Sequence, residues 1–166
     1  MTKYEEMREV VMGKQRDWNE MKDRCYGYFG KFTKGLTQYI GIPDDRIKWL
    51  KKVDNEVRYL PAEEGADYTE MGAIQFCEED GYWHLGLAIT LSKPGVFPSL
   101  WYGFAIMLKE DEKDVLLKTG FENKEWRIPS NQIGSYNEAF ERIATASLEV
   151  LTKGKTYRPT GIGFLS

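Results

Sequence analysis

The first forty residues of the chain have the pattern of a long helix. From Trp18 onward, apolar side chains recur every three or four residues and therefore share one helical face: Trp18, Met21, Cys25, Tyr28, Phe29, Phe32, Leu36, Tyr39 and Ile40. Tyr4, Met7, Val10 and Val11 keep the same spacing, but Gly13 and residues 14–17 interrupt the stripe. The pattern predicts one long helix, or two with a bend near Gly13. The helix is expected to end at Gly41, ahead of Pro43.

The middle of the chain has the alternation and turn signals of an antiparallel sheet. A short helix is expected over residues 44–52. An antiparallel meander of about five strands is then expected, and six segments have strand patterns: 56–60, 70–79, 82–91, 100–109, 115–119 and 125–128. The dipeptide Asp80-Gly81 favours a two-residue hairpin turn, because both residues tolerate positive φ. This turn would pair Phe76 with Leu85 and Cys77 with His84.

The register of this hairpin gives the sheet two different faces. Bulky side chains share the first face: Ile74, Phe76, Trp83, Leu85, Leu87, Ile89, Tyr102, Phe104, Ile106 and Leu108. We call the second face the small-residue face, after its members Ala73, Gly86, Ala88, Gly103 and Ala105; Tyr82, His84 and Trp101 belong to the same side. Three arrangements fit this face. A helix packs on it, or it forms a shallow groove with an aromatic rim that takes a ligand or an extended peptide, or it is exposed without a function.

The C-terminal part of the chain predicts a second helix. It begins near Ser135, which has capping-box spacing to Glu138, and ends at Gly154. The order of elements indicates a single α+β domain: a helical part over 1–53, an antiparallel sheet over 55–130, a C-terminal helix over 135–153 packed on the sheet, and an irregular tail over 154–166.

Charge and hydropathy exclude some classes of partner. The first 55 residues carry 12 Lys and Arg against 9 Asp and Glu, and the remainder carries 11 against 17, so the sheet half is acidic. Neither half has the basic cluster of a nucleic-acid-binding surface. No apolar run approaches the length of a membrane span, and no secretory signal pattern is present, so a cytoplasmic location with free thiols at Cys25 and Cys77 is expected.

Residues with catalytic chemistry are few. His84 is the only histidine, and its predicted neighbour Cys77 is the one candidate nucleophile beside it. No motif supports a thiolate–imidazolium pair, so a structural thiol beside a half-buried imidazole is favoured. One histidine and two distant cysteines do not form the usual structural zinc set. Calcium-loop and phosphate-binding glycine motifs are missing as well. No catalytic residue, metal or cofactor is therefore expected.

Two functional hypotheses remain, with a third about assembly. The first is a non-enzymatic protein-binding module of the inhibitor, immunity or adaptor type, with an acidic, aromatic-bearing surface for a protein partner, a basic one among the candidates. Its candidate contact residues are Trp126, Trp49, Tyr157 and Arg158. The second is a small-molecule-binding or enzymatic domain that uses a groove over the small-residue face, with His84, Cys77, Trp101, Tyr82, Gly86 and Gly103. The third is a homodimer through the helix of residues 4–40.

Overall fold

A computed structural model describes residues 1–52, 59–60, 68–95, 101–153 and 164–165. It has the predicted α+β architecture, with a long N-terminal helix, an antiparallel sheet and a C-terminal helix. The helices are α1 (Lys3–Ile40), α2 (Glu70–Ala73) and α3 (Asn137–Lys153), with 3-10 turns at Asp44–Arg46 and Ser130–Gln132. The strands are β1 (Ile47–Lys52), β2 (Tyr59–Leu60), β3 (Gln75–Phe76), β4 (Trp83–Thr90), β5 (Trp101–Asp111), β6 (Asp114–Thr119), β7 (Glu122–Pro129) and β8 (Phe164–Leu165).

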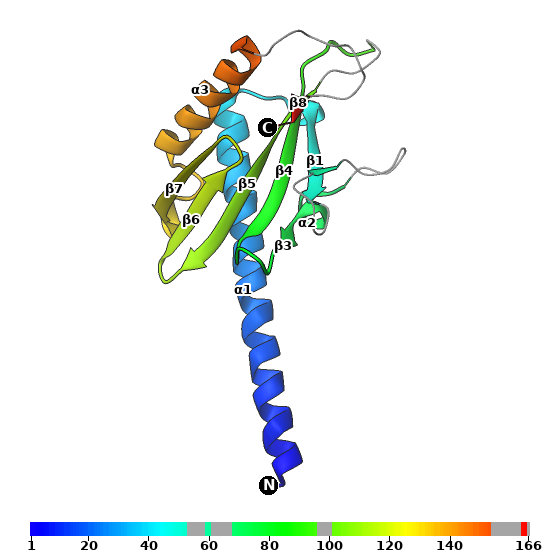
Figure 1. The fold of residues 1–166 in the computed structure, drawn as a ribbon, viewed down its shortest axis with the longest axis vertical. Helices are drawn as coiled ribbons and strands as arrows, with labels where there is room; N and C mark the ends of the chain where they lie inside the picture. The colour runs from blue at the N-terminus through cyan, green and yellow to red at the C-terminus, as the bar shows by residue number, and fades with distance from the viewer. Residues whose placement is uncertain (53–58, 61–67, 96–100, 154–163, 166) are drawn as a thin grey trace.

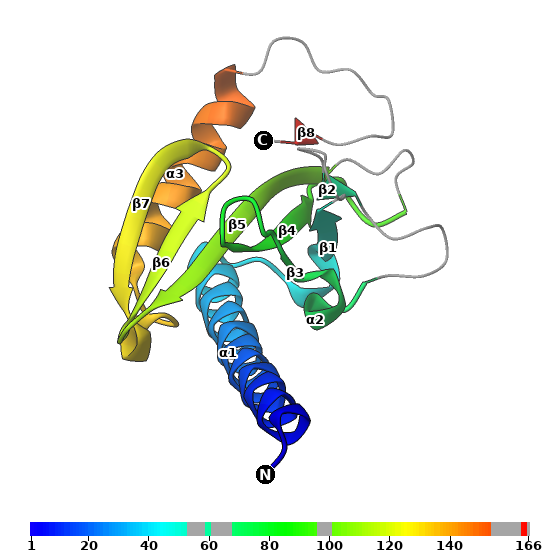
Figure 2. The same ribbon diagram turned by 60° about the horizontal axis from the view of Figure 1, so that its bottom comes forward.

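The strands form one twisted sheet with both long helices on the same face (Figures 1 and 2). The strand order is β2-β1-β4-β5-β6-β7, with β3 beside β4 and β8 parallel to the start of β5. The main core lies between this sheet and the two helices. It contains Phe29 and Phe32 of α1, Phe140 of α3, and the bulky strand face that includes Leu85 and Phe104. The predicted core face of the sheet is therefore confirmed.

Helix α1 is one continuous helix with no break at Gly13. Thr2 and Glu5 form a capping box at its start, where the Thr2 hydroxyl accepts from the Glu5 amide at 3.2 Å. Gly41 ends the helix in the left-handed region, with φ of 82°. The second half of α1 packs on the sheet, whereas the first half extends well beyond it (Figure 1).

Two predicted elements are wrong. Residues 44–52 were expected to form a helix, but residues 47–52 form β1, which pairs with β4 from Ile47↔Ile89 to Leu50↔Gly86. The unpaired edge of β4 decides this conformation, because pairing there places Ile47 and Trp49 against the main core. Residues 70–79 were expected to form one strand, but Glu70–Ala73 is helical, with the Thr69 hydroxyl accepting from the Gly72 amide at 3.0 Å.

The hairpin register differs from the prediction by two residues. Gln75 pairs with His84 and Phe76 with Trp83, so His84 is not the cross-strand partner of Cys77. The turn spans residues 78–81 and is closed by backbone bonds of 2.9 Å from Gly81 N to Cys77 O and from Cys77 N to Tyr82 O. A shift of two residues keeps every side chain on its face, which explains why the face assignment is correct although the pairing is wrong.

The small-residue face is built by direct cross-strand pairs. Gly86 pairs with Ala105, and Ala88 pairs with Gly103, while Leu50 of β1 and Trp101 of β5 pack beside them. Ala88 and Ala105 are only 1% and 4% exposed, although α1 and α3 both lie on the opposite side of the sheet. Ala73 was assigned to this face but belongs to α2 and the main core. The tail, expected to be irregular, contains β8 at its described residues.

Candidate functional site

The structure brings three of the predicted groove residues together at the β3–β4 turn. Cys77, Tyr82 and His84 surround Asp80, which had been assigned only a turn role. Trp101, Gly86 and Gly103 lie further along the small-residue face. Of the predicted interface residues, Trp126 is buried against Tyr136, and Trp49 is partly buried against the main core. Tyr157 and Arg158 lie outside the described residues.

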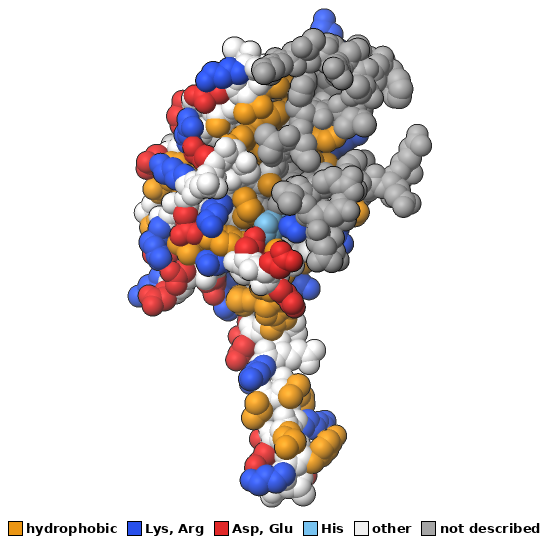
Figure 3. All heavy atoms as spheres, in the orientation of Figure 1, with side chains coloured by type: hydrophobic (Ala, Val, Ile, Leu, Met, Phe, Trp, Pro, Cys, Tyr) orange, Lys and Arg blue, Asp and Glu red, His pale blue; other side chains and the backbone are white. Residues whose placement is uncertain are grey.

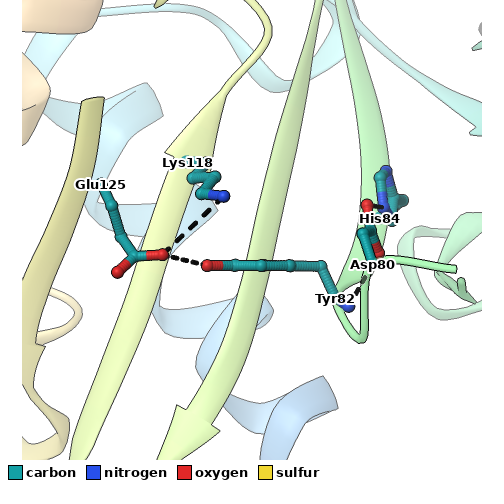
Figure 4. Close-up of polar contacts among 5 residues, drawn as sticks. All are labelled: Asp80, Tyr82, His84, Lys118 and Glu125. Carbon is teal, nitrogen blue, oxygen red and sulfur yellow. Dashed lines mark hydrogen bonds and ion pairs between the residues drawn. The ribbon is translucent and has the colours of Figure 1, made fainter. Parts of the chain in front are cut away.

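Asp80 is the centre of this cluster (Figure 4). Its Oδ2 lies 2.8 Å from Nε2 of His84, and its Oδ1 accepts a hydrogen bond of 2.9 Å from the backbone amide of Tyr82. The second contact is the local turn closure that Asp makes with the backbone two residues on, and it orients the carboxylate toward β4. One residue therefore closes the turn and holds the imidazole.

Cys77 completes a group of three different donor atoms. Its Sγ, a carboxylate oxygen of Asp80 and a ring nitrogen of His84 all lie within 4.8 Å of one another. His84 is almost completely buried at the start of β4, whereas the Asp80 side chain is 42% exposed. The cluster is thus anchored in the sheet on one side and open to solvent on the other.

Burial and the neighbouring polar groups shift the pKa values of both His84 and Asp80. Burial lowers the pKa of His84, with Lys52 acting in the same direction, although the Asp80 carboxylate opposes the shift. For Asp80, partial burial alone would raise the pKa. Hydrogen bonds from the Tyr82 amide, His84 and the Cys77 thiol outweigh that effect, and the pKa is lowered. At neutral pH the cluster therefore presents an ionised carboxylate beside an uncharged imidazole.

A second polar group continues from Tyr82 across the sheet (Figure 4). The buried hydroxyl of Tyr82 donates to the carboxylate of Glu125 on β7, and Nζ of Lys118 on β6 lies 3.8 Å from the same carboxylate. The ammonium groups of Lys109 and Lys118 each lie 4.6 Å from the centroid of the Tyr82 ring. Burial and then the bond to Glu125 raise the pKa of Tyr82.

The order of the groups bears on the chemistry that is available. In Cys–His hydrolases the imidazole contacts the thiol, and the carboxylate orients the imidazole from behind. Here Asp80 stands between Cys77 and His84, so the imidazole is bonded to the carboxylate instead of the thiol. The arrangement does not favour a nucleophilic thiol, but a thiol, a carboxylate and an imidazole that converge are a set of metal ligands.

The other cysteine, Cys25, lies in a different environment from Cys77. Cys25 is completely buried in the main core, and burial raises the pKa of its thiol to about 11. The expectation of free thiols is met for both cysteines.

In the described part of the chain, no helix is long and apolar enough to cross a membrane. Comparison of the chain with protein-family models, with curated proteins and with solved structures found no match.

Proposed function

We propose that the protein is a non-enzymatic binding module that associates with a second copy of itself through the first half of α1. The single observation that carries the proposal is the exposure of apolar residues on the part of α1 that extends beyond the sheet (Figure 3). Tyr4, Met7 and Val11 are 73%, 67% and 62% exposed there. An isolated helix of about 15 residues is marginal in water, and helices gain most of their stability by packing an apolar face. A packing partner would therefore stabilise this segment.

The apolar positions of α1 follow the seven-residue repeat of paired helices. Residues alternately three and four apart form one line along the helix: Tyr4, Met7, Val11, Lys14, Trp18, Met21, Cys25, Tyr28 and Phe32. From Trp18 onward this line packs against the protein's own sheet, although Trp18 is still 40% exposed. Its exposed part, namely Tyr4, Met7, Val11 and Trp18, is here called the exposed seam. A repeat of 3.5 residues keeps such a seam facing a second helix over several turns.

The charge of the segment favours a second copy over other partners. Residues 3–20 carry four basic and five acidic side chains, so two copies repel each other little. A helix that lies on a membrane would have a basic polar face. A strongly charged partner would favour a segment of opposite charge. A second copy brings the same apolar stripe, and one symmetric contact buries both.

The exposed seam offers enough surface for this contact. Burial of its four side chains on both copies removes on the order of 1,000 Å² of accessible surface, at the lower edge of specific interfaces. In an antiparallel pair, Tyr4 of one copy reaches Trp18 of the other. Trp18 already packs on Phe76 and Trp83, with ring centroids 4.9 and 5.5 Å apart. The tip of each helix would then complete an aromatic cluster at the edge of the other sheet.

Other surfaces receive less support from the geometry. The proposal moves the interface from Trp49 and Trp126 to α1, because both tryptophans pack against core residues. A ligand groove over the small-residue face is disfavoured because Ala88 and Ala105 are nearly inaccessible.

The test is the mass of the full chain in solution, measured by sedimentation equilibrium at protein concentrations from about 1 to about 100 μM. The double variant Met7→Gln with Val11→Gln removes apolar surface from the exposed seam. Glu9→Gln with Arg16→Gln changes the opposite side of the same helix and leaves the net charge unchanged. The wild type and the second variant are expected to dimerise. The first variant is expected to be monomeric and to have the near-UV spectrum of the wild type at a dilution at which the wild type is monomeric. A monomeric wild type over the whole range, or equal dimerisation of the first variant, would overturn the proposal.

A further inference from the structure

The donor cluster at the β3–β4 turn has a use that the proposed dimer does not involve. We infer that Cys77, Asp80 and His84 form a binding site for one zinc ion, with the fourth coordination position open to water. Three protein ligands of the sulfur, oxygen and nitrogen types, with one remaining position for solvent, are the composition of an open zinc site.

The spacing of the donor atoms fits a zinc ion. Bonds of about 2.0 Å to nitrogen and oxygen and about 2.3 Å to sulfur place the donors of a tetrahedral ion roughly 3.3 to 3.7 Å apart. In the structure, Asp80 Oδ2 and His84 Nε2 are 2.8 Å apart, and all three donor atoms lie within 4.8 Å of one another. Small rotations of the Cys77 and Asp80 side chains, neither of which is fully buried, would bring the three donors to this spacing.

The backbone holds the ligands in place before an ion arrives. The three ligands span only eight residues, and the Cys77 backbone is bonded to the backbone at both Gly81 and Tyr82, each at 2.9 Å. Gly81 adopts φ of 75°, which lets the chain turn back within this short distance. His84 is fixed by its place in β4, where it pairs with Gln75 on one side and Met107 on the other. Little chain entropy is lost when the ion binds.

The donor set favours zinc over magnesium and calcium. Thiolate and imidazole ligands suit zinc, whereas magnesium and calcium take oxygen ligands almost exclusively. Binding converts the Cys77 thiol to a thiolate and releases its proton to solvent. The thiolate and the Asp80 carboxylate together neutralise the charge of the ion, so a site beside buried His84 carries no net charge. This balance matters because Lys52 places a positive charge close to His84.

Asp80 explains why a zinc site was not expected from the sequence. One histidine and two cysteines that lie far apart in sequence argue against zinc, and Cys25 is indeed enclosed in the core. The third ligand is instead Asp80, which the sequence pattern predicts only as a turn residue.

The experiment uses the full chain, first treated with a chelator and then titrated with zinc alone against a chromophoric competitor. One zinc ion per chain is expected to bind. Cobalt(II) in place of zinc should give the strong visible bands of a tetrahedral ion and a thiolate-to-cobalt charge-transfer band. Cys77→Ser should abolish the charge-transfer band. Cys77→Ser and His84→Gln should each weaken zinc binding by at least about tenfold.

Cys25→Ala is the matched control, because it removes the other thiol of the chain and should leave both the stoichiometry and the cobalt spectrum unchanged. Zinc should also raise the melting temperature of the wild type and not that of Cys77→Ser, since only the folded wild type gains binding energy. The inference is overturned if the wild type shows no saturable zinc binding, or if its cobalt complex lacks the thiolate band. Equal zinc affinity of wild type, Cys77→Ser and His84→Gln would overturn it as well. The cobalt spectrum of the wild type decides the question even if a variant does not fold.

Discussion

Arg24 of α1 binds Glu110 of β5 through two hydrogen bonds, 2.8 Å from Nε to Oε2 and 2.9 Å from Nη2 to Oε1. The hydroxyl of Tyr28, one turn further along α1, donates to the same carboxylate at 3.0 Å. Two side chains of the helix thus fix one carboxylate of the sheet near the point where α1 leaves it. This contact links α1 to the end of β5, close to where the first half of α1 begins to extend beyond the sheet.

Replacement of Glu110 by glutamine should remove a pH-dependent part of the stability. The bond from Arg24, followed by that from Tyr28, lowers the pKa of Glu110 although partial burial opposes the shift. A lowered carboxyl pKa contributes stability above the unfolded value of 4.5, and the contribution is lost as pH falls through the folded value. We expect the wild type to exceed Glu110→Gln by less than about 1 kcal/mol at pH 7, because Arg24 is half exposed. The difference should be smaller near pH 3 than at pH 7, because the contribution is lost as pH falls toward and through the lowered folded pKa.

Urea unfolding at the two pH values measures this difference. Glu112→Gln is the control, since Glu112 is exposed in the adjacent turn. A Glu110→Gln difference that is the same at both pH values would contradict the assignment of the pKa shift to this ion pair.

A methyl group at Gly35 should be far more costly than one at Gly27, eight residues earlier on the same helix. A Cβ at Gly35 would lie 2.2 Å from the carbonyl oxygen of Gly134 and 2.7 Å from Cζ of Phe140, because α1 passes very close to the start of α3. A Cβ at Gly27 meets no atom within 4 Å. Gly35→Ala should lower the free energy of unfolding by about 1–3 kcal/mol or more. Gly27→Ala should raise it by about 0.5–1 kcal/mol through helix propensity. Similar stabilities of the two variants in urea would argue against the close packing of α1 on α3.

Local sequence patterns predict some elements of this fold, whereas long-range strand pairing determines others. Helix α1 was predictable because the three- and four-residue spacing of its apolar side chains persists over many turns. Strands β4 and β5 were predictable because bulky and small side chains alternate along both of them. Strand β1 was not predictable in this way, because residues 47–52 become a strand through their pairing with β4, which is about forty residues away in sequence. The contact between Tyr82 and Glu125 depends on the strand order, which no short pattern encodes.

Tyr82→Phe should reveal how much the contact with Glu125 contributes. The substitution keeps the ring under Lys109 and Lys118 but removes the hydroxyl that donates to the carboxylate. A hydrogen bond to a charged group contributes about 1.5–3 kcal/mol, and Glu125 regains water because it is partly exposed, so a loss of about 1–2 kcal/mol is expected. The difference in unfolding free energy between the wild type and Tyr82→Phe should be present at neutral pH and should vanish at strongly alkaline pH. The reason is that a raised pKa stabilises the fold below the unfolded value of 10.0, and the effect is lost as pH rises through the folded value.

Alkaline absorbance titration gives an independent measure, because Tyr82 should ionise above the ordinary tyrosine pKa of 10.0. The difference between wild type and Tyr82→Phe isolates its signal. Tyr26→Phe serves as the control, since Tyr26 packs edge-on against Trp83 and retains that packing as phenylalanine. An early-titrating difference signal for Tyr82 would mean that its hydroxyl is not held by Glu125.

Ala105→Leu decides between the closed and open forms of the small-residue face. Ala105 lies opposite Gly86 and packs with Leu50, Ala88 and Trp101, and it is 4% exposed. Three extra carbon atoms in a packed layer force neighbouring side chains from their positions, so a loss of about 1–3 kcal/mol is expected. Met107→Leu, two residues along the same face, nearly conserves volume and should cost less than about 1.5 kcal/mol. In a groove that is open for a ligand, the larger side chain would instead occupy empty space and leave the urea midpoint unchanged. The size of the loss at Ala105 therefore reports directly whether a small molecule has room on this side of the sheet.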